Sequence, residues 1–302
     1  MIAWRVARVV ATLAAALLML GLASCMTQQR NGPVTRDGPP PTLQAVESAY
    51  NARVAGLDRM WARAIVRFQS IDQDGNEIDE QGEGHLQLVQ PRNLYFTVGK
   101  LGEPAFELGS NDERYWWIDI RNKSARIGAH AKATPTLAGR AGLPVHPLDL
   151  IELLGITPVK LRTAPRWSVD GRTVEVTVPG RWGDRLLRLD PERLEPVEIE
   201  LRDKAGGPLA VARLTEYEGA IVAGKVSLVV RVAARVFVDV PATSTQVTLW
   251  LRDPENRGAK IKARAFSFES LAQEYGVKSV GSIDQPSTAP AQTVAPARGT
   301  VP

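Results

Sequence analysis

The sequence has little of the chemistry that enzymes need. Its only cysteine is Cys25, so no disulfide can form within one chain, and its three histidines are far apart in sequence. It contains no Gly-x-Ser-x-Gly elbow, P-loop or dinucleotide fingerprint. We therefore expect a protein that is not an enzyme, with no catalytic residue, no metal site and no cofactor.

Clustered charge of one sign is also missing. The formal net charge is +4, and removing Arg5 and Arg8 of the first segment leaves about +2. The lysines and arginines are scattered among acidic residues, whereas a nucleic-acid interface gathers positive charge on one face. We expect no nucleic-acid partner.

The first segment is typical of an export signal. Arg5 and Arg8 precede an apolar run over 9–22 that is short for a membrane span, and this run leads into Leu22-Ala23-Ser24-Cys25. That ending resembles the lipobox of bacterial lipoproteins, which implies cleavage before Cys25 and acylation of its thiol, as by palmitate. An ordinary signal peptide or a membrane anchor with an incidental cysteine is the alternative.

Composition divides the chain into four parts. We assign 1–24 to a lipoprotein signal peptide, 25–41 to the lipidated cysteine and a flexible tether, 42–278 to one folded domain, and 279–302 to a disordered tail rich in proline, alanine and threonine. The domain has no internal break long enough to separate two units.

The domain is predicted to begin with a helix and to continue as strands. Apolar residues recur three or four apart over 43–60, and from 62 the period changes to two. The predicted strands are 62–71, 84–90, 93–98, 105–109, 114–120, 124–129, 172–178, 185–190, 195–202, 208–216, 225–233, 245–251 and 259–268. Turn pairs such as Asp74-Gly75 and Gly206-Gly207 separate many of them, so successive strands should be antiparallel.

Alternation within these strands predicts a sheet with one apolar and one polar face. Leu94, Phe96 and Val98 share one side of a strand, and Tyr95 and Thr97 share the other. A single long antiparallel sheet that follows one helix should curl into an unclosed half-barrel with an apolar concave face. The fold class is therefore mainly β, within α+β.

A second helix is predicted over 147–155. It begins with Pro147, ends at Gly155, and is apolar at nearly every position between them. A helix that is apolar on several sides is normally buried, so this one is expected to plug the concave face. Ordinary core packing is the alternative.

The most aromatic stretch is Trp116-Trp117, within a predicted strand. Adjacent residues of a strand point to opposite faces. We expect Trp116, Ile118 and Ile120 to face the concave side, because that set is wholly apolar. Core packing is the main interpretation, and a sugar-binding platform is the alternative.

Taken in order, these features resemble the LolA/LolB superfamily, and most closely the LolB family of outer-membrane lipoprotein receptors. The likeness spans about residues 60–215 and is carried by the stretches Gly99–Leu108 and Pro147–Gly155. It implies an unclosed half-barrel of about 11 strands with helices over its concave face. Lys100 departs from the family, which tends to have proline there, and the segment 217–268 is longer than the family's end.

The resemblance also maps the family's exposed, membrane-contacting leucine to Leu101. The predicted membrane-insertion loop is then Gly99, Lys100, Leu101 and Gly102, with Lys100 placed to meet anionic headgroups. One leucine in hydrocarbon gains about 1.5–3 kcal/mol, which favours a contact without anchoring the protein. The alternative is that Leu101 folds back over the end of the sheet.

The function expected from these features is transfer of lipid. A membrane-anchored lipoprotein would bind acyl chains, of a lipid or of a lipoprotein, in an apolar cavity and pass them to or from the outer membrane, with a periplasmic carrier protein as a partner. The predicted cavity residues are Phe96, Val98, Phe106, Leu108, Trp116, Ile118, Ile151 and Leu154. Met26 follows Cys25 where an aspartate would favour the inner membrane, so the resemblance implies an outer-membrane anchor that faces the periplasm. The alternative is an envelope sensor or scaffold whose half-barrel binds a partner protein.

Overall fold

The computed structural model describes residues 34–36, 38–72, 74–140, 145–222, 230–256 and 258–285. The predicted signal peptide, Cys25 and residues 286–302 of the predicted tail lie outside this part of the chain. What the sequence predicts for them therefore stays a prediction.

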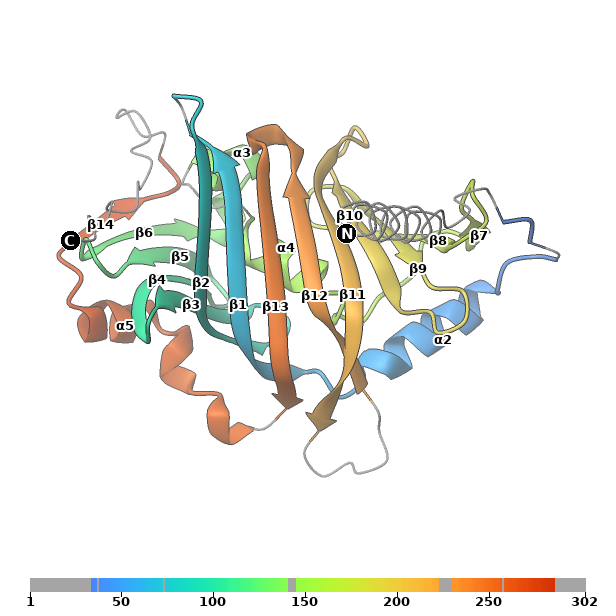
Figure 1. The fold of residues 1–302 in the computed structure, drawn as a ribbon, viewed down its shortest axis with the longest axis horizontal. Helices are drawn as coiled ribbons and strands as arrows, with labels where there is room; N and C mark the ends of the chain where they lie inside the picture. Colours follow the sequence, from blue (N-terminus) through green and yellow to red (C-terminus); the bar gives the residue numbers. More distant parts are fainter. Residues whose placement is uncertain are drawn as a thin grey trace, which may run out of the picture.

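In the described part of the chain, 14 strands form one sheet, in the order β14-β6-β5-β4-β3-β2-β1-β13-β12-β11-β10-β9-β8-β7 (Figure 1). The first group of strands is β1 (Arg59–Ile71), β2 (Glu77–Val89), β3 (Asn93–Lys100), β4 (Glu103–Ser110), β5 (Arg114–Asp119) and β6 (Ser124–Ala129). The second is β7 (Arg166–Trp167), β8 (Val174–Pro179), β9 (Asp184–Leu189), β10 (Pro196–Arg202), β11 (Pro208–Val222), β12 (Val230–Val240), β13 (Thr245–Asn256) and β14 (Ser279–Ser282).

The sheet is an open, strongly curved half-barrel, as the sequence predicts, although it has more strands than expected. Nearly all neighbouring strands are antiparallel, and β14 runs parallel to β6. β14 and β7 are the two ends of the order, so the sheet does not close on itself. In Figure 1 the long central strands stand upright and the strands on either side turn away from them.

Four α-helices accompany the described sheet: α2 (Leu43–Val54), α3 (Pro135–Arg140), α4 (Pro147–Leu153) and α5 (Phe268–Tyr275). Short 3-10 turns complete them: η1 (His130–Lys132), η2 (Pro241–Thr243), η3 (Gly258–Lys260) and η4 (Ala263–Phe266). Figure 1 shows α4 behind β12 and β13, while α5 lies beside β3 and β4.

Helix α2 is shorter than the predicted 43–60. It begins at Leu43, after the N-cap residue Thr42, whose hydroxyl accepts from the amide of Ala45, and it ends at Val54. Strand β1 then begins at Arg59, because the residues that extend the helical pattern also fit a strand pattern: Met60 and Ala62 alternate with exposed Arg59 and partly exposed Trp61.

The end of the domain differs from the prediction in two ways. Residues 259–268 form 3-10 turns and the start of α5 instead of a strand. The fold also continues past 278, since β14 pairs with β6 and the Ile283 side chain is buried. The ordered domain therefore includes the first residues of the segment predicted to be a disordered tail.

Two apolar clusters hold the structure. The larger lies on the concave side and joins both halves of the sheet to α2 and α4. The smaller, which we call the outer core, lies on the convex side of β3–β6 beneath η4 and α5. Its buried members are Tyr95, Trp116, Ile118, Ile120, Ala125, Ala265, Phe268 and Leu271.

Candidate functional site

Six of the eight predicted cavity residues lie together on the concave side. Strand register pairs Phe96 with Leu108 and Val98 with Phe106, which places these four side chains on one face. Ile151 of α4 and Leu154, just after it, belong to the same apolar cluster. Phe106 is partly buried and stacks on Trp117, with 4.5 Å between ring centroids.

Trp116 and Ile118 lie on the other face, so the prediction that they line the concave side is wrong. Both belong to the outer core, where Trp116 lies 5.9 Å from the ring of Phe268 in α5. The apolar character of the set Trp116, Ile118 and Ile120 reflects a second buried face. The C-terminal segment covers that face, and the alternation of β5 alone does not reveal this cover.

The concave face is filled by the chain's own side chains. Val98, Leu108, Ile151 and Leu154 are 4%, 5%, 1% and 1% exposed, because α4 lies against β3 and β4 and the four side chains belong to one apolar cluster. Among the residues that the structure describes, the expected open groove is therefore not present on this face.

Polar side chains fasten α4 at both ends. At its start, the indole N–H of Trp182 donates to Asp149 Oδ2 at 2.7 Å, and Arg181 Nε lies 3.6 Å from Asp149 Oδ1. At its end, the hydroxyl of Tyr50 in α2 donates to the carbonyl of Gly155 at 3.0 Å. Helix α4 is thus held in place by these hydrogen bonds and this ion pair in addition to its apolar packing.

In α4 the carboxyl group of Asp149 is buried and that of Glu152 is partly buried, which raises the pKa of both. Loss of solvent raises the pKa of Asp149 to about 7, against a smaller opposing effect of the Trp182 hydrogen bond. Burial also raises the pKa of Glu152, which lies 3.5 Å from Arg185. Near neutral pH, α4 therefore carries a carboxyl group that is close to its titration point.

A group of aromatic and imidazole rings surrounds the start of α4. The ring of His146, the N-cap residue, lies 4.4 Å from Tyr115 and 5.3 Å from His130. Burial lowers the pKa of His146 to about 2, so its ring is neutral at ordinary pH. Among the described side chains, His146 Nε2, His130 Nδ1 and Tyr115 Oη are buried with no hydrogen-bond partner.

The hairpin between β3 and β4 carries the predicted membrane-contacting residue. Leu101 is 97% exposed and has φ +55°, and Gly102 follows it with φ +80°. Left-handed backbone is unfavourable for leucine by roughly 1–2 kcal/mol, and asparagine or glycine is the usual choice at this turn position. Folding gains nothing from this side chain, and the alternative that Leu101 folds back over the sheet does not hold.

The neighbours of Leu101 are placed differently from the prediction in one respect. Gly99 and Lys100 end β3, and Gly102 forms the turn with Leu101. The Lys100 ammonium forms an ion pair with Glu80 of β2, so it is engaged with its own sheet in this conformation.

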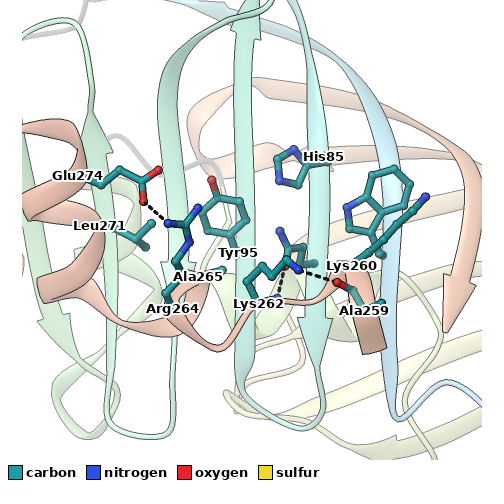
Figure 2. Close-up of a pocket in the computed structure, with 11 residues that line it drawn as sticks. His85, Tyr95, Ala259, Lys260, Lys262, Arg264, Ala265, Leu271 and Glu274 are labelled. Atoms are coloured by element: carbon teal, nitrogen blue, oxygen red, sulfur yellow. Dashed lines mark hydrogen bonds and ion pairs between the residues drawn. The ribbon is translucent and has the colours of Figure 1, made fainter. Parts of the chain in front are cut away.

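The convex face holds two adjoining cavities that sequence reasoning missed. One, of about 500 Å³, lies between β1–β3 and the C-terminal segment (Figure 2). The other, of about 720 Å³, continues toward the β3–β4 hairpin. Trp61, His85 and Tyr95 line both, and we call the combined feature the outer groove.

A sequence signal for the wall of this groove was available. Ser267 and Gly276 bracket a segment in which Phe268, Leu271 and Tyr275 recur at helical spacing. The structure shows Ser267 as the N-cap of α5 and Gly276 as its left-handed C-cap. Read as a helix, this stretch would have predicted an amphipathic element able to cover a second apolar face.

A buried carboxyl group lies under the outer groove. Glu107 of β4 is fully buried and accepts from the indole N–H of Trp116 at 3.2 Å. Desolvation raises the pKa of Glu107 to about 8. Nearby, the hydroxyls of Tyr95 and Tyr275 are 3.0 Å apart, which ties β3 to the end of α5.

Metal-ligand clusters and membrane-spanning helices are both absent from the described part of the chain. Among the described residues, no group of three or more His, Cys, Asp or Glu side chains is arranged to hold a metal ion. Within the same part of the chain, none of the helices combines the length and apolar character that a membrane crossing requires.

Comparison with known proteins concerns the fold. No protein-family model and no curated protein sequence matches the chain. Among solved structures, a DUF1329 family protein from Desulfovibrio piger is 10% identical, with a TM-score of 0.50 over 76% of this chain and 98% of that one. The chain shares its overall fold with that protein.

A LolA superfamily protein from Nitrosomonas europaea is also similar. It is 13% identical, with a TM-score of 0.49 over 76% of this chain and 99% of the other.

Proposed function

We propose that this protein is a LolB-like envelope lipoprotein that takes up acyl chains on the concave face of its half-barrel when α4 moves aside. The observation that carries the proposal is α4 itself: a seven-residue helix whose apolar side chains fill the space a guest would occupy. The anchor would be acylated Cys25, in the outer membrane and facing the periplasm.

The free energy gained by burying the apolar side chains of α4 is similar to the free energy gained by burying an acyl chain, so one could replace the other. Five aliphatic side chains in and next to α4 are buried, namely Leu148, Leu150, Ile151, Leu153 and Leu154. Their burial is worth about 8–15 kcal/mol in total, at about 1.5–3 kcal/mol each. An acyl chain of about fifteen methylenes gains about 12 kcal/mol at about 0.8 kcal/mol for each. An acyl chain can therefore replace the helix without a large net cost.

Leu101 would supply the membrane contact. Its side chain stands fully in solvent on a strained turn, and such strain is a reason to look for a role outside folding. Hydrocarbon would cover the leucine at the moment of transfer, while a periplasmic carrier or the membrane supplies or accepts the acyl chain.

The test follows the position of α4 during binding. The test uses a Cys25→Ser form without the predicted signal segment. In it, Leu154→Cys introduces one thiol at the C-terminal end of α4, where the native side chain is 1% exposed. We expect palmitate to raise the rate of thiol labelling at this position by about tenfold or more. Ile118→Cys, buried in the outer core, is the matched control and should stay protected.

Two results would end the proposal. One is a fluorescent acyl probe that does not bind at tens of micromolar, and the other is binding that leaves the Leu154→Cys thiol protected. In the first case a partner protein on the half-barrel would be the better explanation.

A further inference from the structure

The floor of the outer groove is built by two rows of side chains that cross β3, β2 and β1. Register places Tyr95, Gln87 and Trp61 in one row. The next row holds Thr97, His85 and Arg63. These side chains point to the convex face, opposite the predicted acyl site, so the groove stands independently of the function proposed above.

Three rings form a continuous strip along this floor. The centroids of Trp61 and His85 are 6.3 Å apart with 27° between their planes, and those of His85 and Tyr95 are 5.4 Å apart. Figure 2 shows His85 and Tyr95 beside each other on neighbouring strands. Burial lowers the pKa of His85, so its ring is neutral near pH 7.

Cationic side chains of the C-terminal segment border the strip. Lys260 lies 3.9 Å from the centroid of the Trp61 ring and forms an ion pair with Glu255. Arg264 lies 3.7 Å from Glu274 and has further guanidinium donors to offer. Lys262 Nζ donates to the carbonyl of Ala259 at 2.8 Å. Figure 2 shows both residues on the C-terminal segment.

Hydrogen-bonding groups and cations thus surround an apolar strip of rings. Within a groove of this size, such a lining matches a ligand that combines a flat apolar face, a rim of hydroxyl groups and a negative charge. A linear acidic peptide would make little use of the ring faces, and a neutral sugar would make little use of Lys262 and Arg264.

We propose that the outer groove binds an acidic saccharide, with a sugar ring against Trp61, His85 and Tyr95 and its carboxylate, phosphate or sulfate beside Lys262 and Arg264. The same chemistry occurs in a free acidic oligosaccharide and in the headgroup of an acidic glycolipid. The C-terminal segment completes the site, because Ala259, Lys260, Lys262 and Arg264 form its wall.

Calorimetric titration of the whole chain distinguishes an acidic saccharide from a neutral saccharide and from a planar anion as the ligand. Trigalacturonate is the acidic probe, maltotriose the neutral one, and adenosine monophosphate a planar anion without a saccharide chain. We expect trigalacturonate to bind about tenfold or more tightly than either, and to weaken at high salt. Flotation with phosphatidylcholine vesicles, with and without sulfated galactosylceramide, tests the lipid-borne source.

Substitutions of two exposed cations and one partly exposed ring locate the binding site. Lys262→Gln and Arg264→Gln should each weaken the binding of the acidic probe by about threefold or more, and Trp61→Leu should weaken both saccharides. Lys204→Gln, which removes the same charge in the exposed turn before β11, is the control. Thermal melting checks that each variant is folded.

The proposal is overturned if neither trigalacturonate nor the glycolipid vesicles bind. It is also overturned if adenosine monophosphate binds more tightly than the saccharides, or if Lys262→Gln and Arg264→Gln leave binding unchanged. Loss of palmitate binding with retained trigalacturonate binding would count against the acyl-carrier function alone.

Discussion

Strands β3 to β5 are covered on both faces, and the two covers differ in origin. The concave face packs against α4, which lies within the half-barrel in sequence. The convex face packs against η4 and α5, which follow the last central strand. The inner cover, α4, carries a buried carboxyl group, Asp149, whose pKa is raised to about 7. The outer cover, η4 and α5, is followed by a further strand, β14, which pairs with β6. We infer that the inner cover is the one built to move.

Adjacent tryptophans give the sharpest test of this comparison. Trp116→Ala removes a fully buried indole from the outer core and should lower the free energy of unfolding by about 3–5 kcal/mol. Trp117→Ala removes a partly buried ring from the concave side and should cost less. Urea denaturation measures both.

Limited proteolysis shows whether a substitution has exposed the C-terminal segment with η4 and α5. Trp116→Ala should speed tryptic cleavage after Lys262 and Arg264, since Phe268 loses its neighbour. Trp117→Ala should leave that cleavage rate unchanged. Equal rates in the two variants would show that the two covers are not independent.

Glu107, buried beneath the C-terminal segment, should make the free energy of unfolding depend on pH. Because its pKa is raised from 4.5 to about 8, the folded state holds a proton that the unfolded state releases. Its stabilising contribution is complete below about pH 4.5 and is lost as the pH rises through 8. Glu107→Gln should remove this loss, on the order of 1–4 kcal/mol between pH 5 and 9. Thermal melting across that range measures it, with exposed Glu103→Gln as the control.

Asp149 should make the stability of α4 packing depend on pH in the same direction, with a smaller effect and at lower pH. Its pKa is raised from 3.8 to about 7, so stability from this group is complete below about pH 4 and is lost as the pH rises through 7. After correction for the higher intrinsic reactivity of any thiol at higher pH, labelling of the Leu154→Cys thiol should therefore be faster at pH 8 than at pH 6. Asp149→Asn should reduce that difference, and a pH response unchanged by the substitution would assign it to another group, such as Glu152.

The smallest effect on stability is expected at Leu101. Leu101→Asn suits the left-handed backbone better and should raise the free energy of unfolding by about 0.5–1 kcal/mol. The same change should weaken association with phospholipid vesicles, because it removes the exposed apolar side chain. Val169→Asn changes another fully exposed residue and should leave vesicle association as it was. A stability loss in Leu101→Asn would indicate a structural role for the leucine.

Much of the inner architecture could be predicted because its signals are local. Alternation placed Phe96, Val98 and Leu108 on one face, and Pro147 with Gly155 marked the limits of α4. The outer core could not be assigned in this way. Trp116 and Ile118 are apolar because a segment far along the chain covers them. In the same region the side-chain amide of Asn111 donates to the backbone carbonyl of Phe266, 155 positions away.

By itself, the sequence determined the curled antiparallel sheet, the buried helix after its first six strands and the turn that presents Leu101, because periodicity, capping and turn preferences act over a few neighbouring residues. Tertiary structure alone decided that Trp116 faces outward and that the C-terminal segment crosses β1–β3 to form a groove. These outcomes depend on which distant surfaces meet when the sheet curls, and no stretch of neighbouring residues carries that information.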